Sequence, residues 1–141
     1  MTIKIKKLSE NAIPPKFANP RDAGMDFYSN ETIELQPNER KLISTGISMA
    51  IPAGYVGLIW DKSGLASKHG LKTMAGVIDS GYRGEIKILV HNLSLETYLV
   101  ESGKKIAQML IQPIEQRKII EVDCLDETER GEGGFGSTGL N

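Results

Sequence analysis

The sequence predicts an all-β protein with a single domain, and three observations predict that class. Apolar residues alternate with polar ones, β-branched residues gather in short runs, and long patterns with helical spacing are missing. Turn sequences such as Gln36-Pro37-Asn38 and Pro52-Ala53-Gly54 separate these runs. Many short strands at this spacing indicate a sandwich, a barrel or a jelly roll.

Alternation and β-branched runs predict eight strands, and one further segment is predicted to be a short helix. The strands are expected at residues 3–8, 32–35, 41–51, 56–60, 85–91, 98–100, 106–113 and 119–122. The helix is expected at residues 63–69, where Ser63 would cap its start and Gly70 would end it.

Composition places the chain among ordinary globular proteins and argues against several classes of partner. The 141 residues are 40% hydrophobic and 25% charged, with a net charge of −1, so no general affinity for nucleic acid or membranes is expected. The N-terminus lacks the apolar stretch of a signal peptide, and the single cysteine, Cys124, fits a reducing compartment. These features predict a cytoplasmic protein, or another site inside a cell, and not a secreted one.

The only shift in composition divides a β domain, residues 1–129, from a glycine-rich tail, residues 130–141. Such a tail is either a disordered end or a segment that orders over a ligand. In the second case its amides and hydroxyls would contact phosphate, and Phe135 would lie on a flat ring. Gly131 and Gly136 have Walker A spacing, but Ser137 stands where that loop needs lysine, which excludes a P-loop NTPase.

The segment from Gly76 to Glu85 carries the first candidate catalytic group. Ser80-Gly81 predicts a two-residue hairpin turn, with Asp79 and Tyr82 facing each other at its tip. Asp79 would act there as a general base or would only stabilise the turn.

Three further segments place polar groups beside apolar strands. Lys62 and Ser63 open the predicted helix, either as an anion site or as an ordinary helix start. Asp26 lies in an apolar segment, where it would hold Mg²⁺ through water or pair with a buried cation. The amide of Gln108 would donate to a phosphate or to a neighbouring backbone group. The histidines and Cys124 lack zinc-ligand spacing.

Five segments, taken in order, resemble the motifs of the trimeric deoxyuridine triphosphatase (dUTPase) family. They read AGMDFYS, DKSGLAS, GVIDSGYRGE, GKKIAQM and RGEGGFGSTG, and together they run from Ala23 to Gly139. Each motif is weak alone, whereas five in this order within an all-β chain of this length are specific.

The resemblance implies a jelly-roll-like subunit of the β-clip type and a homotrimer with three active sites between subunits. It implies hydrolysis of dUTP to dUMP and pyrophosphate, which keeps uracil out of DNA and supplies dUMP for thymidylate synthesis. The implied cofactor is Mg²⁺, held mainly by the triphosphate, and neither nucleic acid nor a membrane is an implied partner.

The resemblance also assigns roles to residues. It makes Asp79 the carboxylate that positions and activates water for attack at the α-phosphorus. The backbone of the third motif would read uracil and exclude a 5-methyl group, while Tyr82 would pack under the deoxyribose. Phe135 would cover the uracil, and Asp26 would lie near the metal or its waters. The other residues implied to bind substrate are Lys62, Ser63, Gly64, Gly76, Val77, Ile78, Gln108, Arg130, Gly136, Ser137 and Thr138.

Departures from the family pattern concern three positions. Lys62 stands where arginine is usual, and Asp61 stands where a small residue or proline is usual. Lysine keeps the charge but loses the bidentate geometry of arginine. Gly81 stands where many members have aspartate, and it suits the predicted turn.

Two alternative functions use the same fold. The dCTP deaminases have a similar third motif, but they need a glutamate in the following strand, where this chain has Leu89. A nucleotide-binding regulatory protein would not need Asp79, Tyr82 and the complete tail together.

Overall fold

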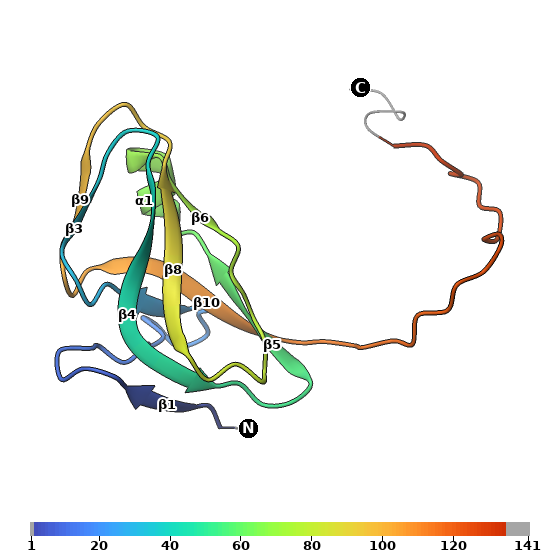
Figure 1. The fold of residues 1–141 in the computed structure, drawn as a ribbon, viewed down its shortest axis with the longest axis horizontal. Helices are drawn as coiled ribbons and strands as arrows, with labels where there is room; N and C mark the ends of the chain where they lie inside the picture. Colours follow the sequence, from blue (N-terminus) through green and yellow to red (C-terminus); the bar gives the residue numbers. More distant parts are fainter. Residues whose placement is uncertain (1, 135–141) are drawn as a thin grey trace.

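The computed structural model describes residues 2–134, and Figure 1 shows a body of β-strands with a long C-terminal arm. Two four-stranded sheets and one two-stranded sheet are all antiparallel. Within the described residues the only helix is short. The predicted all-β, jelly-roll-like class with one short helix is therefore confirmed.

The first sheet has the strand order β1-β4-β8-β6. Its strands are β1 (Lys4–Lys7), β4 (Arg40–Ala50), β8 (Glu85–Asn92) and β6 (Leu71–Met74). Alternation is clearest in β8, which buries Ile86, Ile88 and Val90 and turns the residues between them outward. The predicted strands at 41–51 and 85–91 are confirmed to within one residue at each end.

The second sheet has the strand order β2-β10-β5-β7. Its strands are β2 (Met25–Tyr28), β10 (Lys105–Pro113), β5 (Tyr55–Trp60) and β7 (Val77–Ile78). The prediction missed β2 because all four of its residues are buried, which leaves no alternation to detect. It also missed β6 and β7, which have four and two residues.

The strands β3 (Ile33–Leu35) and β9 (Tyr98–Val100), both predicted, pair as a two-stranded sheet that closes one side of the core. The buried Asn92 side chain ties it to the body by donating to the carbonyls of Leu35 at 2.9 Å and Glu96 at 2.7 Å. The core draws side chains from all three sheets. Its fully buried members include Phe27, Leu35, Ile43, Ile47, Ile86, Ile88 and Met109.

The helix α1 (Ser63–His69) has the predicted bounds. Gly70 ends it in a left-handed conformation, as expected. The predicted N-cap is wrong, because Lys62 occupies that position with extended backbone and no side-chain capping bond. Ser63 is instead the first helical residue, and its side chain is exposed beside Lys62.

The turn at Ser80-Gly81 is confirmed, since the Tyr82 amide donates to the Asp79 carbonyl at 3.1 Å. The predicted hairpin around it is wrong. β7 pairs with β5 in the second sheet, whereas β8 pairs with β4 and β6 in the first. The turn therefore links the second sheet to the first.

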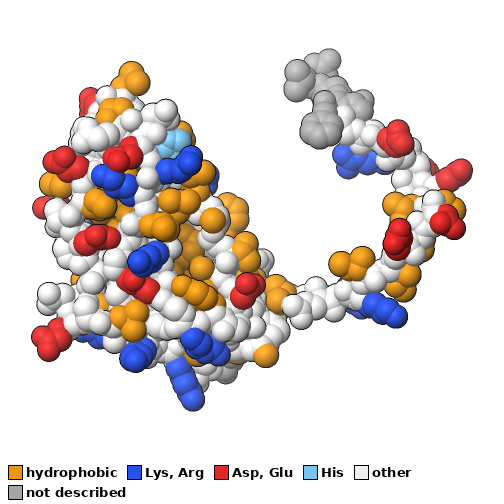
Figure 2. Space-filling view, viewed as in Figure 1, with side chains coloured by type: hydrophobic (Ala, Val, Ile, Leu, Met, Phe, Trp, Pro, Cys, Tyr) orange, Lys and Arg blue, Asp and Glu red, His pale blue; other side chains and the backbone are white. Residues whose placement is uncertain are grey.

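The predicted strand at 119–122 is wrong, because these residues form no strand and have no strand partner among residues 2–134. They belong to an arm, defined here as residues 114–134, which leaves the body at the end of β10 (Figure 1). Figure 2 shows charged and apolar side chains along the arm, which curves away from the body. Ile119 and Leu125 are almost fully exposed there. Within residues 2–134, no helix has the length and apolar character needed to cross a membrane.

Candidate active site

Asp26 on β2 is held between two lysines. Its carboxylate is only 3% exposed; Lys62 Nζ contacts Oδ1, and Lys105 Nζ lies 2.7 Å from Oδ2. Lys105 arrives from β10, the neighbouring strand, and Lys62 follows the end of β5. A buried carboxylate is costly unless it is paired, so the two ammonium groups explain how an apolar strand tolerates aspartate. Of the two interpretations of Asp26, the structure shows the ion pair.

The charges of this cluster stabilise one another. Burial by itself raises the pKa of Asp26, but hydrogen bonds and charges from Lys105 and Lys62 outweigh burial and hold that pKa below its ordinary value. Asp26 in turn raises the pKa of Lys105, mainly through their hydrogen bond. The carboxylate is therefore ionised at neutral pH, with its two oxygens directed at separate lysines.

Asp61 and Gln108 fix the backbone on which Lys62 lies. The Asp61 carboxylate accepts the Thr73 amide at 2.6 Å and the Thr73 hydroxyl at 2.7 Å, and it pairs with Lys72 at 2.7 Å. Gln108 donates its amide to the Asp61 carbonyl at 2.8 Å. The unusual Asp61 is thus an anchor between the first sheet and the start of α1. Gln108 satisfies a neighbouring backbone group, and one of its two N–H groups remains for a ligand.

A hollow of about 270 Å³ lies over this cluster, and we call it the polar hollow. Lys62 and Asp26 line it together with Ser63 and Gln108, and Asp22 adds a second carboxylate. Its two lining carboxylates balance the charges of Lys62 and the adjacent Lys105. The polar hollow therefore has donors for an anion but no surplus of positive charge. Its lining residues are Ala18, Asp22, Ala23, Gly24, Asp26, Lys62, Ser63 and Gln108.

A second, larger hollow of about 610 Å³ lies beside the Asp79–Tyr82 turn, and we call it the turn hollow. The Tyr82 ring is 45% exposed and lines it with Asp79, while Val77 and Leu42 add apolar surface. The turn is closed by the Asp79 carbonyl, so the Asp79 carboxylate is not needed to close it. The remaining lining residues are Ile78, Glu85 and Lys87.

The two hollows of one chain share no lining residue, and the turn hollow is lined by β7 of the second sheet together with β4 and β8 of the first. Asp26, Gln108 and Trp60 form one row across β2, β10 and β5. Asp79 directly follows the β7 residue that pairs with Gly57. Asp79 lies about four residues along the strands and three strand spacings across the sheet from Asp26. The distance between them is therefore on the order of 20 Å. One bound triphosphate therefore cannot lie in the polar hollow and touch Asp79 of the same chain.

The sequence-predicted residues thus fall into three groups. Lys62, Ser63 and Gln108 meet at the polar hollow, with Gly64 next to them on α1. Asp79 and Tyr82 meet at the turn hollow. Arg130 lies on the arm, where its Nε donates to the Gly133 carbonyl at 2.8 Å. Val77 and Ile78 line the turn hollow with Asp79 and Tyr82, and Gly76 directly precedes Val77. Phe135, Gly136, Ser137 and Thr138 lie outside the described residues.

Lys105 and Asp22 are the site residues that the sequence did not reveal. Lys105 reaches Asp26 only through the register of β10 against β2. Asp22 lies in the loop before β2, where its carboxylate accepts the Asn19 amide at 2.9 Å. Lys105 lies within the fourth motif and Asp22 directly precedes the first, but neither was assigned a role from the sequence.

Residues 2–134 contain no group of three or more His, Cys, Asp or Glu side chains placed to hold a metal ion. Asp22 and Asp26 both line the polar hollow, and a carboxylate has about four acceptor positions, so each can still accept hydrogen bonds from metal-bound water. These residues fit an Mg²⁺ ion that is bound to a phosphate ligand and touches the protein through water. They do not fit a metal held by protein ligands alone.

Replacement of Asp26 is expected to weaken the fold in a pH-dependent way. Its folded-state pKa is depressed, so its stabilisation is present above its unfolded pKa of about 3.8 and is lost as pH falls through the folded value. Asp26→Asn is therefore expected to lower the free energy of unfolding by about 2 kcal/mol at pH 7. Urea denaturation of both proteins from pH 7 to pH 3 should show the difference shrinking in acid. Asp123→Asn, in the exposed arm, is the matched control, and an equal difference at every pH would contradict the ion pair.

Comparison with known proteins places this geometry in a family. The family model described as dUTPase matches residues 10–139. A deoxyuridine 5'-triphosphate nucleotidohydrolase of Clostridium kluyveri is 50% identical over 141 residues, covering 99% of each chain. A dUTPase variant of Staphylococcus bacteriophage 80alpha, solved with dUpNHpp, is 35% identical with a TM-score of 0.94, covering 99% of each chain.

A third relative concerns metal binding. A dUTPase variant from phage phi11 of S. aureus, whose structure describes the coordination of a structural Mg(II) ion, is 32% identical with a TM-score of 0.85. It covers 90% of this chain, and this chain covers all of it. The family match spans the five motifs and both hollows. The chain belongs to the dUTPase family.

Proposed function

We propose that this protein hydrolyses dUTP to dUMP and pyrophosphate, with Asp79 holding the water that attacks the α-phosphorus. The observation that carries the proposal is the turn hollow, where an exposed carboxylate and a half-exposed tyrosine ring meet at a turn that closes without the carboxylate. Because the Asp79 carboxylate makes no hydrogen bond to residues 2–134, it can accept a proton from water as a general base.

The uracil ring is proposed to bind along the outer edge of β7. This strand is the last in its sheet, so the backbone groups on its outer side have no partner among the described strands. Edge groups of this kind read the hydrogen-bonding edge of a planar ligand, as they would read another strand. Val77 and Ile78 would contribute these groups, with Gly76 at the entrance, and Tyr82 would contact the deoxyribose and exclude a 2′-hydroxyl.

The triphosphate is proposed to occupy a polar hollow, with Lys62, Ser63, Gly64 and Gln108 as donors. A triphosphate brings about four negative charges, and the balanced charges of this hollow cannot neutralise them. Mg²⁺ bound to the triphosphate supplies the missing positive charge, and Asp22 and Asp26 accept hydrogen bonds from its waters. Arg130 adds a further cation from the tail, which would clamp the phosphates with Ser137 and Thr138 and cover the uracil with Phe135. Gly136, between Phe135 and Ser137, would let the tail backbone approach the phosphates closely.

The separation of the two hollows supports a site built between chains, and we propose a homotrimer. About 20 Å lies between Asp79 and the polar hollow of one chain, so catalysis needs the turn hollow of one chain beside the polar hollow of another. The arm supports the same assembly, since Ile119, Val122 and Leu125 are exposed apolar residues that a neighbouring chain would cover. A mass measurement in solution tests the trimer directly.

In a cell this reaction would keep uracil out of DNA and supply dUMP for thymidylate synthesis. The substrate would then be drawn from the free nucleotides of the cell interior. No contact with nucleic acid or a membrane is needed for this role.

The activity can be tested with a panel of four nucleotides. The protein is incubated with dUTP, dTTP, UTP or dCTP in the presence of Mg²⁺, and pyrophosphate and ammonia are measured. We expect pyrophosphate from dUTP at a rate at least about 100-fold above that from the other three nucleotides. The proposed site recognises uracil and excludes both a 5-methyl group and a 2′-hydroxyl. Ammonia released from dCTP would instead indicate a deaminase.

The deaminase alternative lacks its catalytic carboxylate. Leu89 on β8 pairs with Leu42 of β4 and Met74 of β6, so apolar side chains surround the position where that chemistry needs glutamate. Failure to release either product, with dUTP bound, would favour the non-catalytic binding protein.

A further inference from the structure

An irregularity in β4 lies next to the loop that carries Asp79 and Tyr82. The ladder between β4 and β8 runs regularly as far as the pair Ser44 and Lys87, and it resumes at Ser48 and Glu85. Three residues of β4 therefore face one residue of β8, which is a bulge with two extra residues. Bulges of this kind bend a strand and redirect the groups beside them. This bulge, residues 45–47, lies opposite the point where the loop 79–84 enters β8.

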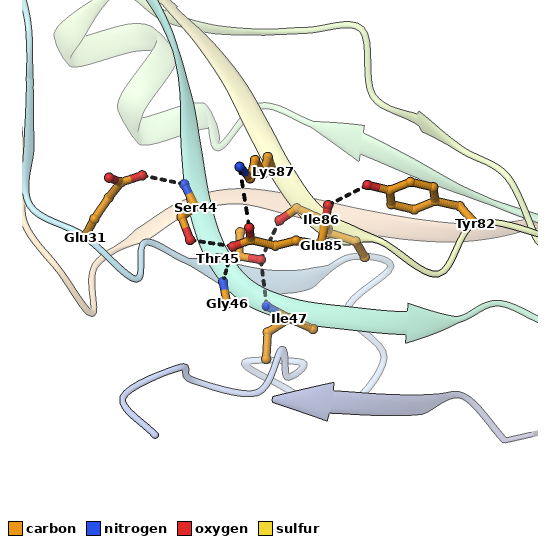
Figure 3. Close-up of polar contacts among 9 residues, drawn as sticks. All are labelled: Glu31, Ser44, Thr45, Gly46, Ile47, Tyr82, Glu85, Ile86 and Lys87. Atoms are coloured by element: carbon orange, nitrogen blue, oxygen red, sulfur yellow. Dashed lines mark hydrogen bonds and ion pairs between the residues drawn. The ribbon is translucent and has the colours of Figure 1, made fainter. Parts of the chain in front are cut away.

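The bulge needs Gly46 and directs its amide toward Glu85. Gly46 has φ +65°, and a Cβ at this position would lie 2.7 Å from the Ala12 Cβ. Its N–H donates to Glu85 Oε1 at 2.9 Å, and the Ser44 hydroxyl donates to the same oxygen (Figure 3). One carboxylate oxygen thus satisfies the Gly46 amide, which the interrupted ladder would otherwise leave unpaired, together with the Ser44 hydroxyl.

Further hydrogen bonds join the bulge to the chain on both sides of Glu85. The Thr45 hydroxyl donates to the Ile86 carbonyl at 2.5 Å, as Figure 3 shows, and the Ser48 hydroxyl donates to the Arg83 carbonyl at 2.6 Å. In the described part of the chain, the other hydrogen bonds of residues 79–83 are internal to the loop or go to Glu85. The bulge of β4 is therefore the anchor of this loop.

Tyr82 is held against the same anchor. Its hydroxyl donates to the Glu85 carbonyl at 2.9 Å (Figure 3), which folds the ring back over Gly84. A Cβ on Gly84 would lie 2.6 Å from the Tyr82 Cζ, so any other residue at this position would displace the ring from its place over the backbone. The orientation of the Tyr82 ring in the turn hollow thus follows the position of Glu85.

Glu85 is suited to this task because it stays ionised. Burial raises the pKa of Glu85, but the Ser44 hydroxyl, the Gly46 amide and Lys87 outweigh burial and leave that pKa lowered. An ionised carboxylate only accepts hydrogen bonds, which matches the two donors it faces, and such charge-assisted bonds are the stronger kind. Lys87 Nζ lies 3.7 Å from the other oxygen, Oε2.

We infer that Glu85 is a positioning residue: by clamping the bulge of β4, it sets the position of Tyr82 and Asp79 in the turn hollow. The inference rests on the proposed roles of these two residues. Glu85 lines the turn hollow, but its carboxylate is directed at Ser44, Gly46 and Lys87, so in this scheme it contacts neither the sugar nor the attacking water. It acts through the loop, so its loss should affect the recognition of the sugar more than the stability of the body.

The test compares Glu85→Gln with Glu31→Gln. Glu31 Oε1 accepts the Ser44 backbone amide at 2.6 Å, so the control removes the charge from a similar bond to the same strand without changing a residue of 83–86. Hydrogen exchange of the peptide 79–84, kcat and KM for dUTP and UTP, and the melting temperature are measured for both. We expect Glu85→Gln to speed exchange in this peptide, to raise KM for dUTP about tenfold and to reduce the preference for dUTP over UTP by a similar factor. Glu31→Gln should leave the exchange rate, the KM for dUTP and the preference for dUTP over UTP within about twofold of the wild-type values.

The outcomes separate this inference from the proposed function. If exchange and kinetics changed in both variants only in proportion to the fall in melting temperature, Glu85 would be merely structural, which would overturn the inference. Faster exchange of the peptide 79–84 in Glu85→Gln, but not in Glu31→Gln, would support the inference. Failure of the wild-type protein to hydrolyse dUTP would overturn the proposed function and would leave this exchange result standing. Ser44→Ala removes one donor to the same carboxylate, and it carries the test if Glu85→Gln does not fold.

Discussion

Asp79→Asn is expected to lower kcat for dUTP by about 10²–10⁴-fold, the usual contribution of one general base. Asparagine keeps the size and the backbone carbonyl that closes the turn, but it cannot accept a proton from water. Because the turn and the turn hollow should persist, binding of a non-hydrolysable dUTP analogue is expected to change by less than about threefold. Steady-state kinetics and titration calorimetry measure the two effects separately.

The control for this variant is Glu96→Gln, which makes the same chemical change on an exposed loop away from both hollows. It should leave kcat and binding unchanged. Loss of turnover and binding together in Asp79→Asn would show that the carboxylate supports the loop and does not activate water.

Removal of residues 130–141 is expected to lower kcat/KM by at least about 100-fold and to change the melting temperature by less than about 2 °C. Residues 130–132 are exposed, and the arm that carries them lies away from the body, so the fold loses little packing (Figure 1). Activity should fall because the phosphates lose the cation Arg130 and the uracil loses Phe135. Differential scanning calorimetry and steady-state kinetics measure the two quantities.

A shorter deletion provides the control for the tail. Removal of Leu140 and Asn141 alone leaves the fifth motif complete and should preserve the kinetics. Unaltered kinetics after the longer deletion would contradict the proposal that the tail completes the site, and a large fall in melting temperature would show that it contributes to the fold.

Local sequence signals predicted the elements whose causes are local. The helix α1 was found with its bounds because Gly70 provides a left-handed end and the strand before it ends at Trp60. The turn at Ser80-Gly81 was found because turn residues act within a few positions. The hairpin was wrong because turn chemistry does not determine which sheet each flanking strand joins, and here β7 and β8 separate.

Burial and pairing determined what the sequence could not show. β2 is buried on both faces, so it lacks alternation, whereas residues 119–122 have apolar character but no strand partner in the described part of the chain. An apolar run of this kind has the same appearance whether its partner lies in the same molecule or in another.

The same distinction applies to the candidate site. Motif spacing located Asp79, Lys62 and Gln108, because each lies in a segment with several informative residues. Lys105 and Glu85 lie in the same motifs as Gln108 and Asp79, but they act through the register of neighbouring strands, and that register depends on a bulge in β10 and another in β4. Such offsets leave little trace in sequence, since a glycine or serine in a strand has many other causes.

The two separate hollows have a genetic consequence. If each reaction centre draws its base from one chain and its phosphate-binding groups from another, a chain that lacks one half can still lend the other. Two alleles that are each inactive, one damaged at Asp79 and one damaged around Lys62, would then restore some working centres when their products mix. An enzyme whose chain holds a whole centre would show no such complementation between alleles.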